Sequence, residues 1–318
     1  MSPSIGYLLP TRERINDGRP EAEPLLRLAE RAEGLGYDSV WVGDSLTSRP
    51  RHEPLTLLAG VAGRTRRVAL GTAVMLPALR HPILMAQQIA TLDQVSAGRV
   101  ILGIGIAQDL PNIRAEFAAA GVPWEKRIGR MIEGLRLCRA LWSGEPVDWD
   151  GRWSIAGERI APTPHQPGGP PIWCGGGVRA ALARAARHFD GWLPNGTPSG
   201  EWREQWAELR EMARNQGRNP DELTGALYAT LALDDDAERA AARVGAYLER
   251  YYGRPAEVLK REQPHFAGSP AAVSDWLAAY AEAGVEHFVL RFPGDHDRQL
   301  DAVAELRDRL GWSPAISP

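Results

Sequence analysis

Three consecutive glycines, Gly175 to Gly177, stand between a short apolar segment and a helical pattern rich in alanine and arginine. At such a turn the bare backbone N–H groups and the N-terminal end of the helix attract an anion, and phosphate is the obvious ligand. One predicted strand later, Asn195-Gly196-Thr197 can add hydrogen-bond donors. We therefore predict a phosphate-binding site at these two segments, with a plain tight turn as the alternative.

Asp44, Ser45 and Gln108 are polar side chains that follow predicted strands, and we take them as the candidate catalytic residues. A carboxylate at Asp44 is placed to orient a ring N–H or a substrate donor. Gly43-Asp44-Ser45 can equally cap a turn or the next helix. We expect the three side chains to contact a cofactor or substrate, although none stands out as a general acid or base.

Several common chemistries lack their motifs. The seven histidines are scattered and no H-E-x-x-H occurs, so we predict no metal site. No G-x-S-x-G is present, which leaves a serine hydrolase without support. The sequence G-I-G-I-A-Q at 103–108 has glutamine where a dinucleotide-binding fingerprint needs its third glycine, so that interpretation is rejected.

Composition indicates a small-molecule partner. The net charge of −3, with 24% charged residues, does not mark a nucleic-acid or anionic-membrane partner. The two cysteines, Cys138 and Cys174, form no disulfide framework and suit a reducing compartment. Because no targeting signal or membrane-spanning run is visible, we predict a cytoplasmic protein.

Apolar runs and helical spacings alternate along the whole chain. Eight strand-then-helix units in 318 residues favour an α/β fold, a (β/α)8 TIM barrel, as a single domain over 1–318. Segments 144–170 and 252–268 interrupt the rhythm and are predicted to be insertions after the fourth helix and before the last unit. In the first, Asp150-Gly151 predicts a two-residue hairpin turn. The strands are predicted at 5–9, 38–42, 68–76, 99–106, 171–174, 191–194, 225–233 and 287–292.

The third predicted strand carries small residues near its end. Val68 to Leu76 is too apolar to alternate with solvent, which suits a buried parallel strand, and Gly71 with Thr72-Ala73 interrupts it. Small residues there allow another group to approach the backbone, and a flat cofactor ring is the candidate. A core strand with a bulge is the alternative. In a barrel the site forms where strands end, which adds Tyr7, Gly105 and Arg291 to the segments above.

Several segments, in this order and spacing, resemble the flavin-dependent luciferase-like monooxygenases, a superfamily that uses reduced FMN or the deazaflavin F420. The matching segments include A-E-G-L-G-Y-D-S-V-W-V-G-D (32–44), V-A-L-G-T-A-V (68–74), A-L-W-S-G-E-P-V-D-W-D-G-R-W (140–153), P-P-I-W-C-G-G-G (170–177) and F-D-G-W-L-P (189–194). A long match also covers 80–105. The resemblance implies a barrel whose C-terminal side holds the flavin, often in a homodimer.

The resemblance also assigns residues to the cofactor. Thr72-Ala73-Val74 would pack behind the isoalloxazine ring, with a non-proline cis peptide at Ala73–Val74. Gly175 to Gly177 and the Asn195-Gly196-Thr197 loop would bind the phosphate. Residues 252–268 would correspond to the mobile segment that covers the site. Together with the strand-end positions, the predicted cofactor contacts are Tyr7, Asp44, Thr72, Ala73, Val74, Gly105, Gly175, Gly176, Gly177, Asn195, Gly196 and Thr197.

Two departures from relatives bear on the reaction. Many F420-using members carry Asp-His where this chain has Asp44-Ser45, and several have glutamate where it has Gln108. A sugar-phosphate dehydrogenase of that type needs a base for the hydroxyl proton, so this chain is not expected to be one. We predict a monooxygenase that takes reduced FMN from a separate flavin reductase and reacts it with O2. An F420-dependent reductase or dehydrogenase is the alternative, and a flavin-binding barrel without turnover is a second one.

Overall fold

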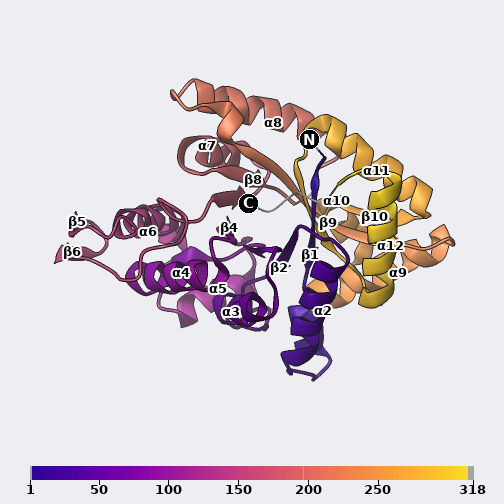
Figure 1. Ribbon diagram of the computed structural model, residues 1–318, viewed down its shortest axis with the longest axis horizontal. Coiled ribbons are helices and arrows are strands. Elements are labelled where there is room, and N and C mark those ends of the chain that lie inside the picture. The colour runs from indigo at the N-terminus through magenta and orange to yellow at the C-terminus, as the bar shows by residue number, and fades with distance from the viewer. Residues whose placement is uncertain (1, 196, 314–318) are drawn as a thin grey trace.

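The computed structural model describes residues 2–195 and 197–313, whose parallel strands close into a barrel surrounded by helices (Figure 1). Around the barrel the strands are hydrogen bonded in the order β11-β1-β2-β3-β4-β7-β8-β9, and β9 closes the ring by pairing with β11. The prediction of a (β/α)8 barrel is confirmed. The barrel strands are β1 (Ser4–Leu8), β2 (Ser39–Val42), β3 (Ala69–Thr72), β4 (Val100–Ile104), β7 (Ile172–Gly175), β8 (Gly191–Leu193), β9 (Thr224–Leu233) and β11 (His287–Arg291).

Helices follow the strands and cover the outside of the barrel. They are α1 (Thr11–Asn16), α2 (Glu23–Gly34), α3 (Pro54–Arg64), α4 (Pro82–Ser96), α5 (Pro111–Ala119), α6 (Arg127–Leu141), α7 (Arg179–His188), α8 (Ser199–Arg214), α9 (Ala237–Tyr252), α11 (Pro270–Ala283) and α12 (His296–Arg309). The sequence analysis missed α1 and α5, because helices of 6 and 9 residues show little periodicity.

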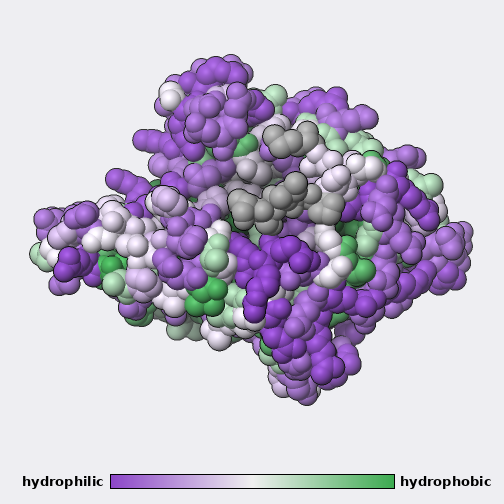
Figure 2. Space-filling view, in the orientation of Figure 1, coloured by the Kyte–Doolittle hydropathy of each residue, from purple (hydrophilic) through white to green (hydrophobic). Residues whose placement is uncertain are grey.

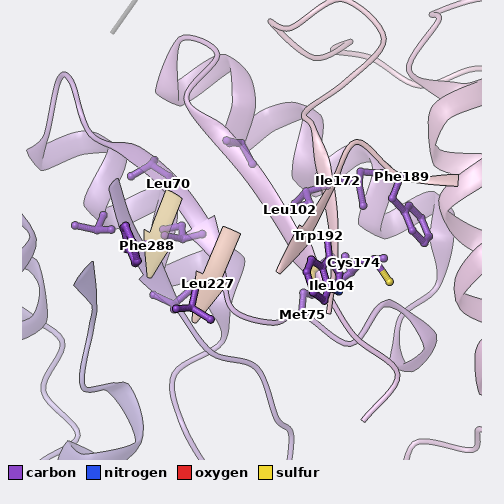
Figure 3. Packing of buried hydrophobic residues seen from close by; sticks show 14 of the residues in the cluster. Leu70, Met75, Leu102, Ile104, Ile172, Cys174, Phe189, Trp192, Leu227 and Phe288 are labelled. Carbon is purple, nitrogen blue, oxygen red and sulfur yellow. The ribbon is translucent and has the colours of Figure 1, made fainter. Parts of the chain in front are cut away.

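The two faces of each strand pack into different clusters. On β2, Val40 and Val42 join the large cluster between strands and helices, whereas Trp41 lies in a smaller cluster inside the barrel. Figure 3 shows part of the large cluster, in which Leu70 of β3 and Phe288 of β11 are labelled. Burial of both faces explains the nearly continuous apolar runs in the sequence.

The interior of the barrel is filled by aromatic side chains. The ring centroids of Trp41 and Trp173 lie 5.5 Å apart. The centroid of the His287 imidazole lies 5.1 Å from the centroid of the Trp173 ring. The hydroxyl of Ser39 is 2.6 Å from Nε1 of Trp41, which donates to it, and 2.7 Å from Nε2 of His287. A Cβ added at Gly71 would overlap the indole of Trp41. The close approach predicted at Gly71 is therefore made by Trp41, and contact of Ala73 and Val74 with a cofactor ring stays a prediction.

Both predicted insertions contain regular structure. In the first, β5 (Val147–Asp150) and β6 (Ser154–Glu158) form an antiparallel hairpin in which Asp150 pairs with Ser154. The turn thus has three residues, not the predicted two, and Arg152 within it donates from its backbone N–H to Glu133 of α6. In the second, the segment predicted to be irregular contains α10 (Ala256–Glu262) and β10 (His265–Gly268), and β10 pairs with β9.

The surface is mainly polar. On the face shown in Figure 2, hydrophilic residues predominate and hydrophobic ones gather only in small groups. Among residues 2–195 and 197–313, no helix has the length and apolar character needed to cross a lipid bilayer.

Candidate active site

A cavity of about 230 Å³ lies at the C-terminal ends of the barrel strands. Nine of the predicted site residues line it: Asp44, Ser45, Ala73, Val74, Gly105, Gln108, Gly175, Gly176 and Asn195. Four other lining residues belong to segments that the sequence analysis expected at the site: Ile106 and Ala107 before Gln108, and Tyr252 and Gln263 in 252–268. The lining residues that it did not expect are Ser48, Arg49, Arg51, Leu76, Ile113, Glu116, Leu193, Tyr228 and Tyr251.

Five of the remaining predicted residues, among them Arg291, do not line this cavity. Tyr7 is fully buried behind it, with its hydroxyl 2.9 Å from Nδ1 of His296. Thr72 is also buried, and its hydroxyl donates to the carbonyl of Gly103 at 2.8 Å. Gly177 follows β7 and Thr197 follows β8, as described below, and Gly196 lies outside the described residues.

Asp44 is held in a buried ion pair. Its side chain is 1% exposed, and Oδ2 accepts hydrogen bonds from Nη1 of Arg80 at 2.5 Å and from the backbone N–H of Leu76 at 2.8 Å. Oδ1 accepts from Nη2 of Arg80 at 3.1 Å. Burial alone would lower the pKa of Arg80, but Asp44 and Glu53 raise it. Both oxygens of Asp44 are therefore engaged in fixing the loop between β3 and α4.

Ser45 belongs to a loop that surrounds a carboxylate the sequence analysis missed. Glu116 of α5 is 2% exposed, and Oε1 accepts from the hydroxyl of Ser45 at 2.6 Å and from the N–H of Thr47 at 2.8 Å. The N–H groups of Leu46 and Ser48 donate to the same oxygen. Burial alone would raise the pKa of Glu116, but these hydrogen bonds lower it below its usual value. Glu116 is an anion that organises the loop after β2.

One wall of the cavity is formed by the end of β3 and the end of β4. The peptide bond between Ala73 and Val74 is cis, as predicted from the resemblance. A Cβ added at Gly105 would lie 2.6 Å from Cγ2 of Val74, so only glycine lets that side chain lie against the strand. Ala73 and Val74 present small apolar groups to the cavity, which suits contact with one face of a planar ring.

The predicted phosphate site contains unpaired hydrogen-bonding groups. The hydroxyl of Thr197 is buried and has no partner among the described residues, and the same holds for Oε1 of Gln205. A Cβ added at Gly177 would lie 4.0 Å from Cγ2 of Thr197 and 3.6 Å from Oε1 of Gln205, so the glycine turn and these side chains adjoin. Helix α7 begins immediately after this turn, and no side chain caps it. The hydroxyl of Thr197, the N–H groups of the glycine turn and the start of α7 are donors that fit the phosphate of a flavin-type cofactor, whereas Oε1 of Gln205 is an acceptor.

Tyr228, Tyr251, Tyr252, Arg49 and Arg51 also line the cavity, and Arg291 contacts these tyrosines without lining it. Arg291 of β11 donates from Nη1 to the hydroxyl of Tyr252 at 2.9 Å and from Nη2 to Thr230 at 2.6 Å. Its Cζ atom lies 4.8 to 5.4 Å from the centroids of four tyrosine rings, those of Tyr228, Tyr247, Tyr251 and Tyr252. Burial raises the pKa of Tyr228 well above its usual value, so its hydroxyl stays protonated.

Gln108 and Asn195 lie at the rim. Nη2 of Arg49 donates to Oε1 of Gln108 at 3.4 Å, and Nδ2 of Asn195 is 3.5 Å from Oε1 of Gln263. Within the described part of the chain, His, Cys, Asp and Glu side chains form no group of three that could hold a metal ion. The cavity thus combines an apolar wall, a phosphate-type turn and a wall of hydrogen-bond donors.

Two proteins of known name are similar to this chain over most of its length. The F420-dependent glucose-6-phosphate dehydrogenase of Nocardia farcinica is 30% identical over 318 aligned positions, covering 90% of this chain and 93% of that protein. The 5,10-methylenetetrahydromethanopterin reductase of Methanolobus tindarius is 31% identical over 268 positions, covering 82% and 77%.

The fold is shared with a crystallised monooxygenase. The structure of the monooxygenase RslO1 from Streptomyces bottropensis superposes with a TM-score of 0.80 at 24% identity, covering 95% of this chain and 98% of that one. Residues 4–308 match the family described as luciferase-like monooxygenase, so the resemblance found in the sequence motifs is confirmed. With this match, and with a closed barrel whose cavity lies at the strand ends, the chain belongs to the luciferase-like monooxygenase family.

Proposed function

We propose that this chain is an oxidoreductase that uses F420 to reduce a small organic substrate by hydride transfer. The two relatives of about 30% identity carry names of F420-linked or tetrahydromethanopterin-linked enzymes, and both matches extend over most of each chain. The sequence motifs favoured reduced FMN and O2, with F420 as the alternative. These relatives support the alternative better, whereas the monooxygenase is similar at the level of fold.

We infer the direction of the reaction from the side chains that line the cavity. Many of them are hydrogen-bond donors, and the carboxylates among them are already hydrogen bonded. The two carboxylates, Asp44 and Glu116, already accept several hydrogen bonds each. A dehydrogenase acting on a hydroxyl group needs a base for the proton, whereas an acceptor that receives a hydride gains negative charge. The hydroxyl of Tyr228, on the cavity wall, is suited to stabilise that charge.

Residues on the two other walls are placed to hold the cofactor. Ala73, Val74 and Gly105 would contact the ring, while Gly176, Gly177 and Thr197 would donate hydrogen bonds to the phosphate. When bound, F420 supplies the hydride. The cis peptide segment and the glycine turn follow strands that are two places apart in the barrel, since β4 lies between β3 and β7.

The test compares F420 with FMN on the purified protein. We expect F420 to bind, and reduced F420 to be oxidised without oxygen when an acceptor substrate is added, followed by the rise in absorbance near 420 nm. Binding of FMN alone, together with substrate-dependent O2 consumption, would instead establish the monooxygenase. Binding of a flavin without any turnover across a broad substrate panel would identify a flavin-binding barrel.

A further inference from the structure

Three arginines gather beside the cavity without acidic partners. Arg12 comes from α1, and Arg49 and Arg51 come from the loop between β2 and α3. We call these residues the arginine cluster. In residues 2–195 and 197–313, none of the three forms an ion pair with a carboxylate, whereas the partly buried Arg80 and the buried Arg307 each do.

Tyrosine rings at the end of α9 hold the cluster together. Cζ of Arg12 lies 4.5 Å from the centroid of Tyr251, and Cζ of Arg51 lies 6.0 Å from the same centroid. Cζ of Arg49 lies 5.0 Å from the centroid of Tyr252. These cation–π contacts place three positive charges on one aromatic surface at the edge of the cavity.

The cluster has hydrogen-bond donors to spare. Nε and Nη1 of Arg12 are buried and have no partner among the described residues. Arg51 donates from Nε to the carbonyl of Arg49 at 3.0 Å and is also hydrogen bonded through its side chain to Tyr251. Burial lowers the pKa of Arg12, and the charges of Arg51 and Arg49 lower it further. Like charges gathered in this way are stabilised by an anion.

Two carboxylates near the cluster are hydrogen bonded to other groups. Burial alone would lower the pKa of Arg51, but Tyr251, Tyr228 and the charge of Glu13 raise it above its usual value. Glu13 accepts a hydrogen bond from the hydroxyl of Tyr247. Glu116, on the same cavity, accepts from the loop at 45–48. Arg291, on the far side of the tyrosines, donates to Thr230 and Tyr252. The positive charge of the arginine cluster therefore faces the cavity through Arg49 and Arg51, the two members that line it.

We propose that Arg49 and Arg51 bind a carboxylate of the substrate, so that this enzyme acts on a small carboxylic acid with a flat or apolar body. The planar guanidinium matches a carboxylate in geometry, and Tyr228, Tyr251 and Tyr252 supply aromatic surface for the rest of the molecule. That the bound acid is also reduced rests on the proposed function, whereas binding of its carboxylate does not. The phosphate of the cofactor is assigned to a different place, the turn between β7 and α7.

The test measures binding of matched acids and amides by calorimetry. Benzoate with benzamide, and cinnamate with cinnamamide, are titrated into the apoprotein and into the F420-loaded protein. In at least one pair the acid should bind at least about tenfold more tightly than the amide, because a hydrogen bond to a charged group contributes more than a neutral one. Arg49→Gln and Arg51→Gln should each remove that preference.

Arg136→Gln is the matched control. Arg136 of α6 also lies over an aromatic ring, that of Trp149 in the β5–β6 hairpin, and neither residue lines this cavity. It should leave the preference unchanged. Equal binding of acid and amide in both pairs would overturn the inference. Arg49 is less enclosed than Arg51, so Arg49→Gln keeps the test valid if Arg51→Gln fails to fold.

A second comparison separates a substrate carboxylate from the anionic side chain of F420. F420 and the deazaflavin that lacks this side chain are bound to wild type and to Arg49→Gln. Loss of affinity for F420 alone would assign the cluster to the cofactor and overturn the inference. If F420 does not bind at all while the acid preference persists in the apoprotein, the proposed function fails and the carboxylate site stands.

Discussion

Asp44 and Arg80 form a two-point ion pair that joins the end of β2 to the start of α4, with distances of 2.5 Å from Nη1 to Oδ2 and 3.1 Å from Nη2 to Oδ1. The same carboxylate accepts the N–H of Leu76, two residues after the cis peptide segment. The pair therefore fixes the loop that carries Ala73 and Val74 to the cavity. Its contribution is to position that wall.

Replacing Asp44 with Asn should destabilise the protein. One partner of a buried pair would be lost and Arg80 would keep only Glu53, which corresponds to a loss of about 3 kcal/mol in the free energy of unfolding. Urea denaturation measures this. Asp109→Asn is the control, because Asp109 pairs with Arg114 on the exposed surface, and we expect no measurable change there. Equal stability of Asp44→Asn and wild type would contradict the positioning role.

Glu116→Gln should loosen the loop at 45–48. In wild type both oxygens of Glu116 accept hydrogen bonds from the loop. The glutamine amide has an NH2 group in place of one oxygen, so one of these hydrogen bonds is lost, and the free energy of unfolding should fall by about 2 kcal/mol. Limited proteolysis should cut the variant within this loop faster than wild type. A variant with unchanged stability and unchanged cleavage would show that the hydrogen bonds to Glu116 contribute little.

The same carboxylate predicts a dependence of stability on pH. The pKa of Glu116 is lower in the folded protein than its ordinary value of 4.5, so its stabilisation is complete above that value and is lost as the pH falls below it. Unfolding free energies measured from about pH 6 down to about pH 3 should therefore decline less steeply for Glu116→Gln than for wild type. Parallel curves would contradict this.

Thr197→Val and Thr72→Val form a reciprocal pair. The hydroxyl of Thr197 has no partner among the described residues, so its removal should leave stability unchanged and weaken cofactor binding about tenfold. The hydroxyl of Thr72 donates to the carbonyl of Gly103, so its removal should lower stability by about 1 to 2 kcal/mol. Thermal denaturation and cofactor titration of both variants check this, and a stability loss in Thr197→Val would indicate a structural role instead.

Ala73→Leu should abolish cofactor binding while the barrel still folds. Ala73 lines the cavity, and a leucine there would occupy the space next to Val74 where we place the ring. Fluorescence titration with F420 and with FMN measures the effect. Ala118→Leu makes the same change on the exposed side of α5 and should bind the cofactor normally. Unchanged affinity in Ala73→Leu would place the ring elsewhere.

The sequence predicted the fold well because each barrel strand is buried on both faces and is therefore a continuous apolar run. It also located the cavity, since strand ends converge in any such barrel. It missed Tyr228, Tyr251 and the arginine cluster, because these residues lie far apart in the chain and meet only through the closure of the ring. Assembly as a homodimer stays a prediction, which light scattering tests.

The two ends of strand β9 pair with different strands: its first part pairs with β8 and β11 of the barrel, and its last part pairs with β10. Thr224 and Gly225 pair with β8, and Ala226 to Thr230 pair with β11, so the first part closes the ring. Thr230 to Leu233 pair with β10, which follows the segment that carries Tyr252 and Gln263 to the cavity. Residues 252–264 can therefore be exchanged for those of a relative without reopening the barrel, which makes this segment the natural place to alter substrate preference by evolution or by design.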